Sequence, residues 1–219
     1  MPLFYQHNIN ESTKLGIWKI EEDEDFFLQI VPLKREITHP HKRLQHLAGR
    51  YLLKTLFPDF PHEEIMIADT KKPYLPYEQY HFSISHCGGY AAAIVSKNER
   101  VGIDIEIPAT KIEKISHKFL NETERKIFAV AGLQLPGYNK EFSHQLQLLT
   151  VLWGAKETVF KWWGWGSVDF SAHILLQPFQ FNDNDSFEAE FIRGTETFTL
   201  KLHYKLFDGL CLVWLSSAS

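Results

Sequence analysis

Cysteine is scarce in this chain of 219 residues, which has only Cys87 and Cys211. Two cysteines so far apart supply neither a disulfide framework nor a zinc site by themselves, and they fit a reducing compartment. No stretch approaches the roughly 20 apolar residues that cross a bilayer. The first residues also lack the basic start and apolar core of an export signal. We therefore expect a cytoplasmic protein with no membrane partner.

Positive charge is also in short supply. Lysine and arginine total 23 against 27 aspartates and glutamates, so the formal net charge is -4. A general polyanion binder would be more basic, and no nucleic-acid partner is expected. The sequence contains no Walker loop and no glycine-rich dinucleotide fingerprint, which excludes the commonest nucleotide-binding folds.

Apolar residues, in contrast, are plentiful at 44%, enough for one large domain or two small ones with proper cores. Residues 15–31 predict a strand, an acidic surface loop and the start of a helix. Apolar residues follow a helical stripe over 42–57, and a second helix is predicted over 145–163. Hairpins are predicted around Gly88–Gly89 and around Asp208–Gly209.

The order of a helix followed by a hairpin occurs in both parts of the sequence. Helices mixed with antiparallel hairpins, without regular βαβ alternation, indicate an α+β fold. We expect two similar halves, each a long helix packed on a small antiparallel sheet, related by a pseudo-twofold axis. The predicted boundary divides residues 1–100 from residues 101–219.

The stretch VGIDIE places two carboxylates in a strand that would otherwise be apolar. Alternate side chains of a strand share a face, so Asp104 and Glu106 lie side by side with Cα atoms about 6.6 Å apart. Their repulsion disfavours double ionisation unless a cation lies between them, and a hard divalent ion is the usual solution. A solvated strand face is the alternative, and the spacing alone does not decide between the two.

A second stretch, WGAKETVFKWWGWG, adds charged groups on one helical stripe. Trp153, Glu157 and Lys161 follow one another at i, i+4 and i+8. They would bring a third carboxylate and a phosphate-binding ammonium, or Glu157 and Lys161 would form a simple ion pair on the helix surface. We expect the tryptophans at the end of the helix to pack in the core and not to bind a ligand; these are Trp162, Trp163 and Trp165.

Basic residues gather in the first part of the chain. Between positions 34 and 54 only Glu36 is acidic, whereas the cationic and histidine side chains are Lys34, Arg35, His39, His41, Lys42, Arg43, His46, Arg50 and Lys54. This local excess indicates an anionic ligand. Lys71, Lys72 and the segment Ser83–His86 add donors, although loop charges and a satisfied histidine at a strand end are the alternatives. A basic half and an acidic half together indicate a metal-complexed polyphosphate as the ligand.

Five stretches, in this order, carry a family resemblance. They are KKPYLP (71–76), FSISHCGG (82–89), VGIDIE (101–106), KFLNETE (118–124) and WGAKETVFK (153–161). The combination resembles the 4'-phosphopantetheinyl transferase superfamily. It is similar to the longer, monomeric, surfactin-synthetase-activator type and differs from the short trimeric holo-acyl-carrier-protein synthases.

The resemblance implies transfer of the 4'-phosphopantetheine arm of coenzyme A to a serine of an apo acyl or peptidyl carrier protein, with release of adenosine 3',5'-bisphosphate. It implies that Asp104, Glu106 and Glu157 hold Mg2+, and that Lys161 contacts a phosphate. Glu124 matches an acidic residue near the metal or the attacking hydroxyl. Either Glu157 or Glu124 would accept the serine proton.

The same resemblance implies which residues bind coenzyme A: Arg43, Arg50, Lys72, Pro73, Ser85 and His86. Of these, Arg50 and His86 would lie near the 3'-phosphate. One departure is the segment 125–152, which is longer than is usual for the family and has an inserted loop predicted at Pro136–Gly137. Because members of the family receive the carrier protein in this region, the identity of the carrier stays open.

Two alternatives to the transferase remain. A Mg2+-dependent hydrolase of nucleotide pyrophosphates would use the same metal and phosphate groups but attack with water. A non-catalytic module would bind coenzyme A or a carrier protein without modifying it. The full set of Asp104, Glu106, Glu157 and Lys161 argues against mere binding.

Overall fold

The computed structural model describes residues 3–33, 36–132 and 144–218. The loop predicted at Pro136–Gly137 lies outside the described residues, as do Lys34 and Arg35 of the basic stretch. The chain forms two compact units. Unit 1 comprises Met1–Ile105 together with Ser216–Ser219, and unit 2 comprises Glu106–Leu215.

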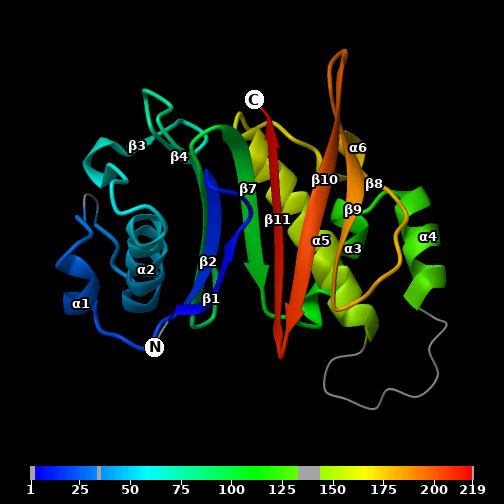
Figure 1. Ribbon diagram of the computed structural model, residues 1–219. Helices are drawn as coiled ribbons and strands as arrows, with labels where there is room; N and C mark the ends of the chain where they lie inside the picture. Colours follow the sequence, from blue (N-terminus) through cyan, green and yellow to red (C-terminus); the bar gives the residue numbers. More distant parts are fainter. Residues whose placement is uncertain (1–2, 34–35, 133–143, 219) are drawn as a thin grey trace. The chain divides into compact units, whose positions relative to one another are not determined.

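Unit 1 is built on an antiparallel sheet with the strand order β1-β2-β6-β5 (Figure 1). Its elements are β1 (Leu3–Asn8), β2 (Thr13–Lys19), α1 (Glu24–Leu28), α2 (Pro40–Leu56), the 3-10 helix η1 (His62–Glu64), β3 (Met66–Ile67), β4 (Pro73–Tyr74), β5 (His81–Cys87), β6 (Tyr90–Ser96) and β7 (Glu99–Glu106), whose last residue belongs to unit 2. The β5–β6 hairpin pairs Cys87 with Tyr90, which leaves the predicted Gly88–Gly89 turn between them.

Helix α2 packs its apolar stripe against this sheet. Leu47, Ala48 and Leu52 are fully buried in a core that also contains Trp18 of β2. Gly49 allows the helix to approach closely, because a Cβ atom at this position would lie 2.6 Å from Cγ2 of Ile84 on β5. The contact brings α2, which carries Arg50, close to β5, which ends in Ser85, His86 and Cys87.

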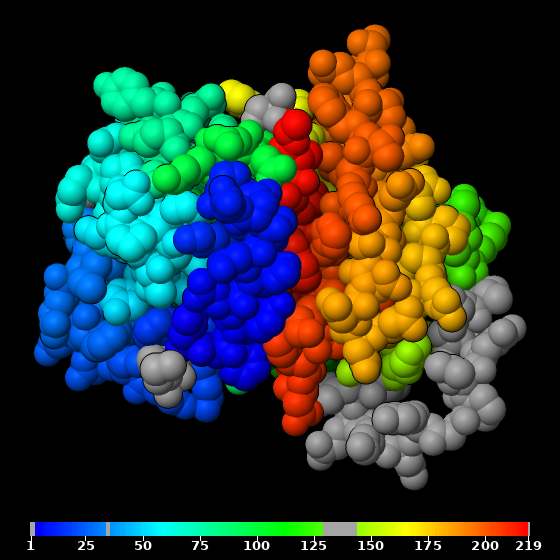
Figure 2. Space-filling model, in the orientation of Figure 1, coloured from blue at the N-terminus to red at the C-terminus, as the bar shows by residue number. Residues whose placement is uncertain are grey.

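Unit 2 contains four helices in its described part and a sheet in which β11, β10, β9 and β8 are neighbours in that order. Its elements are α3 (Lys111–Phe119), α4 (Glu122–Gly132), α5 (His144–Trp163), α6 (Phe170–His173), β8 (Ile174–Leu176), β9 (Asn184–Arg193), β10 (Glu196–Phe207) and β11 (Leu210–Ala218), whose last three residues belong to unit 1. The pairing of Phe207 with Leu210 confirms the hairpin predicted at Asp208–Gly209. The tip of the β9–β10 hairpin stands out from the surface of unit 2 (Figure 2).

The long helix α5 forms the centre of the unit 2 core. Val151, Ala155 and Val159 are fully buried in one cluster with strand residues such as Phe191 and Leu202. Among the tryptophans at the end of α5, Trp162 belongs to the core, being 3% exposed. The expectation is wrong for Trp165, which is 70% exposed. The physical reason is the left-handed backbone of Gly164, with φ 77°, which ends the helix before Trp165 can join its buried face.

The predicted mixture of helices and antiparallel sheets is confirmed. The two long helices and both hairpins occur where the periodicity and the turn residues predict them. The pseudo-twofold relation between the halves stays a prediction. In the ranges described, no helix has the length and apolar character needed to cross a membrane.

Candidate functional site

Asp104 lies in the buried part of β7. The apolar side chains of Val101, Ile103 and Ile105 are buried, as expected for a core strand. Asp104 is also buried, with only 3% of its surface exposed. The alternative of a solvated strand face is therefore wrong for this residue. Burial of a carboxylate is costly unless it is hydrogen-bonded, and the hydroxyl of Ser85 donates to Oδ1 of Asp104 at 2.7 Å.

Two serines of β5 connect the FSISHC and VGIDIE stretches. Ser85 contacts the Asp104 side chain, and the backbone N–H of Ile103 donates to Oγ of Ser83 at 3.2 Å. Both serines are buried. These hydrogen bonds connect β5 to β7, and the contact of Ser85 with coenzyme A stays a prediction.

Glu106, at the end of β7, is held by a residue of α5. The indole Nε1–H of Trp153 donates to Oε1 of Glu106 at 3.1 Å. The indole is held by an edge contact with Phe119, whose ring centroid is 5.2 Å away, and by a tilted contact with Phe170, whose centroid is 5.7 Å away. Glu157 lies one helical turn after Trp153 on the same stripe of α5, and its approach to Glu106 stays a prediction. Both glutamates are half-buried.

Lys161 follows Glu157 by one further turn of α5 and is also half-buried. Trp153, Glu157 and Lys161 thus form the continuous helical stripe that the sequence predicts. A stripe of this kind presents a carboxylate and an ammonium next to each other. A carboxylate can bind a hard cation or accept a proton, and an ammonium can stabilise phosphate charge.

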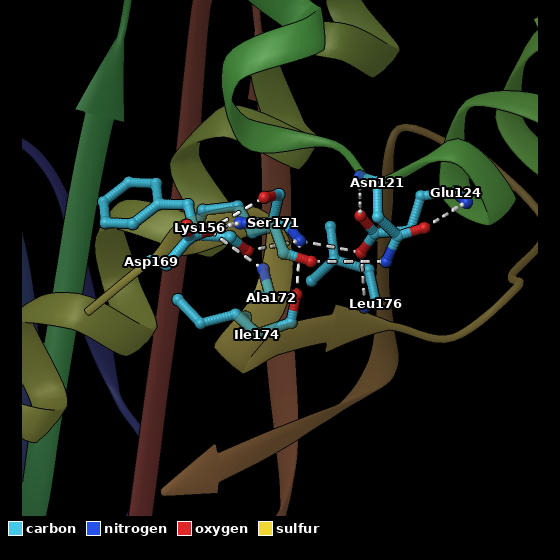
Figure 3. A network of polar contacts seen from close by, with 9 residues as sticks. Asn121, Glu124, Lys156, Asp169, Ser171, Ala172, Ile174 and Leu176 are labelled. Atoms are coloured by element: carbon cyan, nitrogen blue, oxygen red, sulfur yellow. Dashed lines mark hydrogen bonds and ion pairs between the residues drawn. The ribbon is translucent and has the colours of Figure 1, made fainter.

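Glu124 has a different environment from Glu157. Its side chain forms an ion pair of 2.7 Å with Lys156 in which the exposed fractions are 3% for Glu124 and 0% for Lys156. Figure 3 shows Lys156 and Glu124 within a network of polar contacts that also includes Asn121, Ile174 and Leu176. The predicted catalytic role of Glu124 therefore involves a carboxylate that is already engaged inside unit 2.

The residues predicted to bind coenzyme A belong to unit 1. His86 is exposed near the end of β5. A guanidinium nitrogen of Arg50 lies 3.0 Å from Nδ1 of His46. Arg43 donates to Glu24 at 2.7 Å and to the carbonyl of Ile37 at 3.0 Å, so its guanidinium is partly committed to contacts within the unit.

Lys72 is the most perturbed cation of this group. Burial lowers the pKa of Lys72 from 10.5 to about 8, and the nearby charge of Arg100 acts in the same direction. Pro73 follows it as the first residue of β4. A half-buried ammonium beside another cation is a favourable place for an anion, because a bound phosphate would relieve the repulsion.

The donor chemistry of the predicted metal ligands suits Mg2+. In the described ranges no three histidine, cysteine or acidic side chains form a ready-made metal cluster. Mg2+ at phosphate-transfer sites commonly uses one or two carboxylates together with waters and substrate phosphates. Glu106 and Glu157 fit that pattern within unit 2. Asp104 belongs to unit 1, and its convergence with them stays a prediction.

Sequence reasoning missed two contacts made by residues of the candidate site. Trp153 is the hydrogen-bond donor to Glu106, and Lys156 is the buried partner of Glu124. The signal for Trp153 is its place four residues before Glu157, which puts its indole on the same stripe. Lys156 gives no such signal, because a lysine within a helix is usually exposed.

Comparison with known proteins defines the class. A model of the 4'-phosphopantetheinyl transferase superfamily matches residues 100–212. The chain therefore belongs to this superfamily, and the resemblance identified from its motifs is confirmed.

Among curated proteins, the chain is similar to enterobactin synthase component D of Escherichia coli O157:H7 and of Shigella flexneri. Each is 31% identical over 123 residues, which cover 55% of this chain and 54% of the relative. The protein of the same name from Salmonella typhi is 28% identical over 123 residues, which cover 55% of this chain and 47% of the relative. The match thus spans about half the length of these relatives.

Proposed function

We propose that this protein transfers the 4'-phosphopantetheine arm of coenzyme A to a serine of an apo acyl or peptidyl carrier protein. The superfamily membership supports the reaction class. The observation that carries the proposal is the hydrogen bond between Trp153 and Glu106. On α5, Trp153 lies one helical turn before Glu157 and two turns before Lys161. This arrangement supplies carboxylates and an ammonium to a diphosphate.

In the proposed reaction the serine hydroxyl attacks the phosphorus next to the pantetheine arm. An oxygen–phosphorus bond to serine forms, and the bond to the second phosphate breaks, which releases adenosine 3',5'-bisphosphate. Glu157 accepts the proton of the serine hydroxyl. Lys161 stabilises the negative charge that develops on the leaving phosphate.

The proposed ligands of Mg2+ are Asp104, Glu106 and Glu157. When bound, Mg2+ supplies electrostatic stabilisation to the phosphate oxygens. Trp153 orients the Glu106 carboxylate, and Ser85 orients that of Asp104 through the hydrogen bonds described above. These donors reduce the freedom of the carboxylates before the substrate arrives, which is the advantage of a preorganised site.

On the coenzyme A side, we propose that His86 and Arg50 contact the 3'-phosphate and that Lys72, with Pro73, binds the nucleotide end. The lowered pKa of Lys72 supports this role, since a phosphate would favour the charged form of the ammonium. Arg43 and Ser85 complete the proposed set. We further propose that the protein acts as a monomer, as the resemblance implies, and in the cytoplasm, in line with its few cysteines.

A panel of apo carrier proteins tests the proposal. The protein is mixed with Mg2+, coenzyme A and each carrier, and intact-mass spectrometry follows the serine. We expect a phosphopantetheine mass shift on at least one carrier. Asp104→Ala and Glu157→Ala should each lower turnover on the order of 10²-fold or more. Wild-type rates in either variant would remove the metal site from the account.

The same experiment separates the two alternatives. A hydrolase would release adenosine 3',5'-bisphosphate from coenzyme A when no carrier is present. A binding module would retain coenzyme A without releasing the bisphosphate and without modifying any carrier. The transferase requires the carrier for release.

A further inference from the structure

Lys156 directly precedes Glu157 in the sequence, and its side chain is fully buried. Its Nζ atom donates to Oε1 of Glu124 at 2.7 Å, to the carbonyl of Phe170 at 3.0 Å and to the carbonyl of Ile174. An ammonium has three N–H donors. The three acceptors therefore match it, and Lys156 has no donor left for a substrate phosphate.

The carboxylate of Glu124 is engaged on both oxygens. Oε1 accepts from Lys156 and from the backbone N–H of Leu176 at 2.8 Å, and Oε2 accepts from the backbone N–H of Asn121 at 2.9 Å. In return, the N–H of Glu124 donates to Oδ1 of Asn121 at 2.9 Å. This reciprocal pair is a capping box at the start of α4.

The ion pair joins segments that are distant in the sequence. Lys156 comes from the middle of α5 and Glu124 from the first turn of α4, while the carbonyls of Phe170 and Ile174 and the N–H of Leu176 come from α6 and β8 (Figure 3). At the N-terminus of α6, Oδ1 of Asp169 accepts hydrogen bonds from the backbone N–H groups of Ser171 and Ala172. This cap stabilises the short helix whose ends provide the two carbonyls that bind Lys156. Removing either charge would leave the other buried and unpaired, which is strongly destabilising.

The position of Lys156 directly before Glu157 gives the network a role in the site. Successive side chains on an α-helix differ by about 100° around its axis. A rotation of α5 that moved Glu157 would also move Lys156 out of its three contacts. The buried pair thus fixes the angular position at which Glu157 and Trp153 are presented.

We infer that Glu124 and Lys156 are positioning residues of the transferase and that Glu124 is not its proton acceptor. A proton acceptor must come within hydrogen-bond reach of the serine hydroxyl. The side chain of Glu124 is 3% exposed and its oxygens accept three hydrogen bonds. This inference rests on the proposed function, in which Glu157 accepts the proton.

A pair of single variants and their combination test the inference. Glu124→Gln keeps the size of the side chain but leaves the positive charge of Lys156 unpaired. Lys156→Met leaves the negative charge of Glu124 unpaired. The double variant removes both charges, so neither side chain is left as an unpaired buried ion, which is the costly outcome of breaking a buried pair. Glu122→Gln is the matched control, because Glu122 occupies the same helical turn and forms an exposed pair with Lys126 at 2.8 Å.

We expect Glu124→Gln to lower turnover about tenfold or more and to raise the Mg2+ concentration for half-maximal activity about 10-fold, the lower end of the loss seen on disturbing residues that orient metal ligands. The double variant should recover part of both losses, because no unpaired charge remains although the carbonyls of Phe170 and Ile174 still lack their donor, whereas the control should match the wild type. If Glu124 accepts the proton, changing Lys156 cannot rescue its loss. Equal inactivity of the single and the double variant, with both folded, would overturn the inference.

Two further readouts separate positioning from stability and from the function itself. The pH–rate profile of the double variant should keep the limb that reports the proton acceptor, and its disappearance would overturn the inference. Hydrogen exchange of the α5 and β8 amides needs no substrate. The exchange should be faster in Glu124→Gln and return towards the wild-type rate in the double variant. Unchanged exchange in Glu124→Gln would contradict the inference that the buried pair fixes the position of α5. A wild-type protein that modifies no carrier would instead refute the proposed function.

Discussion

The indole of Trp153 donates a hydrogen bond to Glu106 over a separation of 47 residues, with 3.1 Å between Nε1 and Oε1. The bond links the end of β7 to the helix that carries Glu157. Aromatic contacts with Phe119 and Phe170 hold the ring in place. Trp153 therefore orients the carboxylate of Glu106, one of the proposed metal ligands.

Replacing Trp153 with Phe should weaken Mg2+ binding while preserving the aromatic packing. The variant loses the N–H donor, so the Glu106 carboxylate gains freedom. Removal of a group that orients a metal ligand typically costs about 10- to 100-fold in metal affinity or activity. Activity measured against Mg2+ concentration should show a higher half-saturation point. An unchanged half-saturation point would mean that the indole does not orient this ligand.

Replacing His86 with Ala should chiefly raise the Michaelis constant for coenzyme A. The proposed contact of His86 with the 3'-phosphate lies away from the reacting phosphorus, so its loss removes binding that the ground and transition states share. Steady-state kinetics at saturating carrier protein check the effect, with His7→Ala, an exposed histidine of β1, as the control. An unchanged Michaelis constant would return His86 to a structural role at the end of β5.

Coenzyme A binding should take up a proton near pH 8 through Lys72. Burial holds the pKa of Lys72 at about 8 in the free protein, and a bound phosphate would raise it by favouring the ammonium. The affinity should therefore fall as the pH rises above 8, by at most about tenfold per pH unit for one proton. Calorimetry in buffers of different ionisation heat counts the protons. Lys72→Arg stays charged throughout this range, and equal proton uptake by both proteins would refute the role of Lys72.

Gly49→Ala should destabilise unit 1 although alanine favours helices. The added Cβ would lie 2.6 Å from Cγ2 of Ile84, a β-branched side chain that cannot swing away. Overpacking of this kind costs about 1–3 kcal/mol, which outweighs a helix-propensity gain of about 1 kcal/mol. Urea unfolding gives the difference. Gly89→Ala, where no atom lies within 4 Å of the new Cβ, is the control, and a more stable Gly49→Ala protein would contradict the close contact.

The helices and hairpins could be predicted because their signals are local. The apolar stripe of residues 42–57 and the turn residues Asp208 and Gly209 act within a few positions of the chain. Trp165 was mistaken for core because the apolar pattern continues past the helix end, whereas the backbone of Gly164 turns the chain away. Gly49 gave no signal either, since its importance depends on Ile84 of a strand that lies far along the sequence.

The site was predictable only as a set of residue types. Spacing placed Asp104 beside Glu106 on a strand and Glu157 on a helical stripe, but their hydrogen-bond partners come from other elements. Ser85 reaches Asp104 from β5, and Lys156 reaches Glu124 from α5. Because a short stretch of sequence does not contain these partners, Glu124 and Glu157 looked equally suited to accept a proton until their surroundings were known.

The most direct test of phosphopantetheine transfer is the ratio of adenosine 3',5'-bisphosphate released to phosphopantetheinyl-serine formed, measured on one reaction by chromatography and intact-mass spectrometry. We expect one bisphosphate for each modified serine and no release when the carrier protein is left out. Release that continues without a carrier, or that exceeds the modified serine, would show that water is the acceptor and would contradict phosphopantetheine transfer.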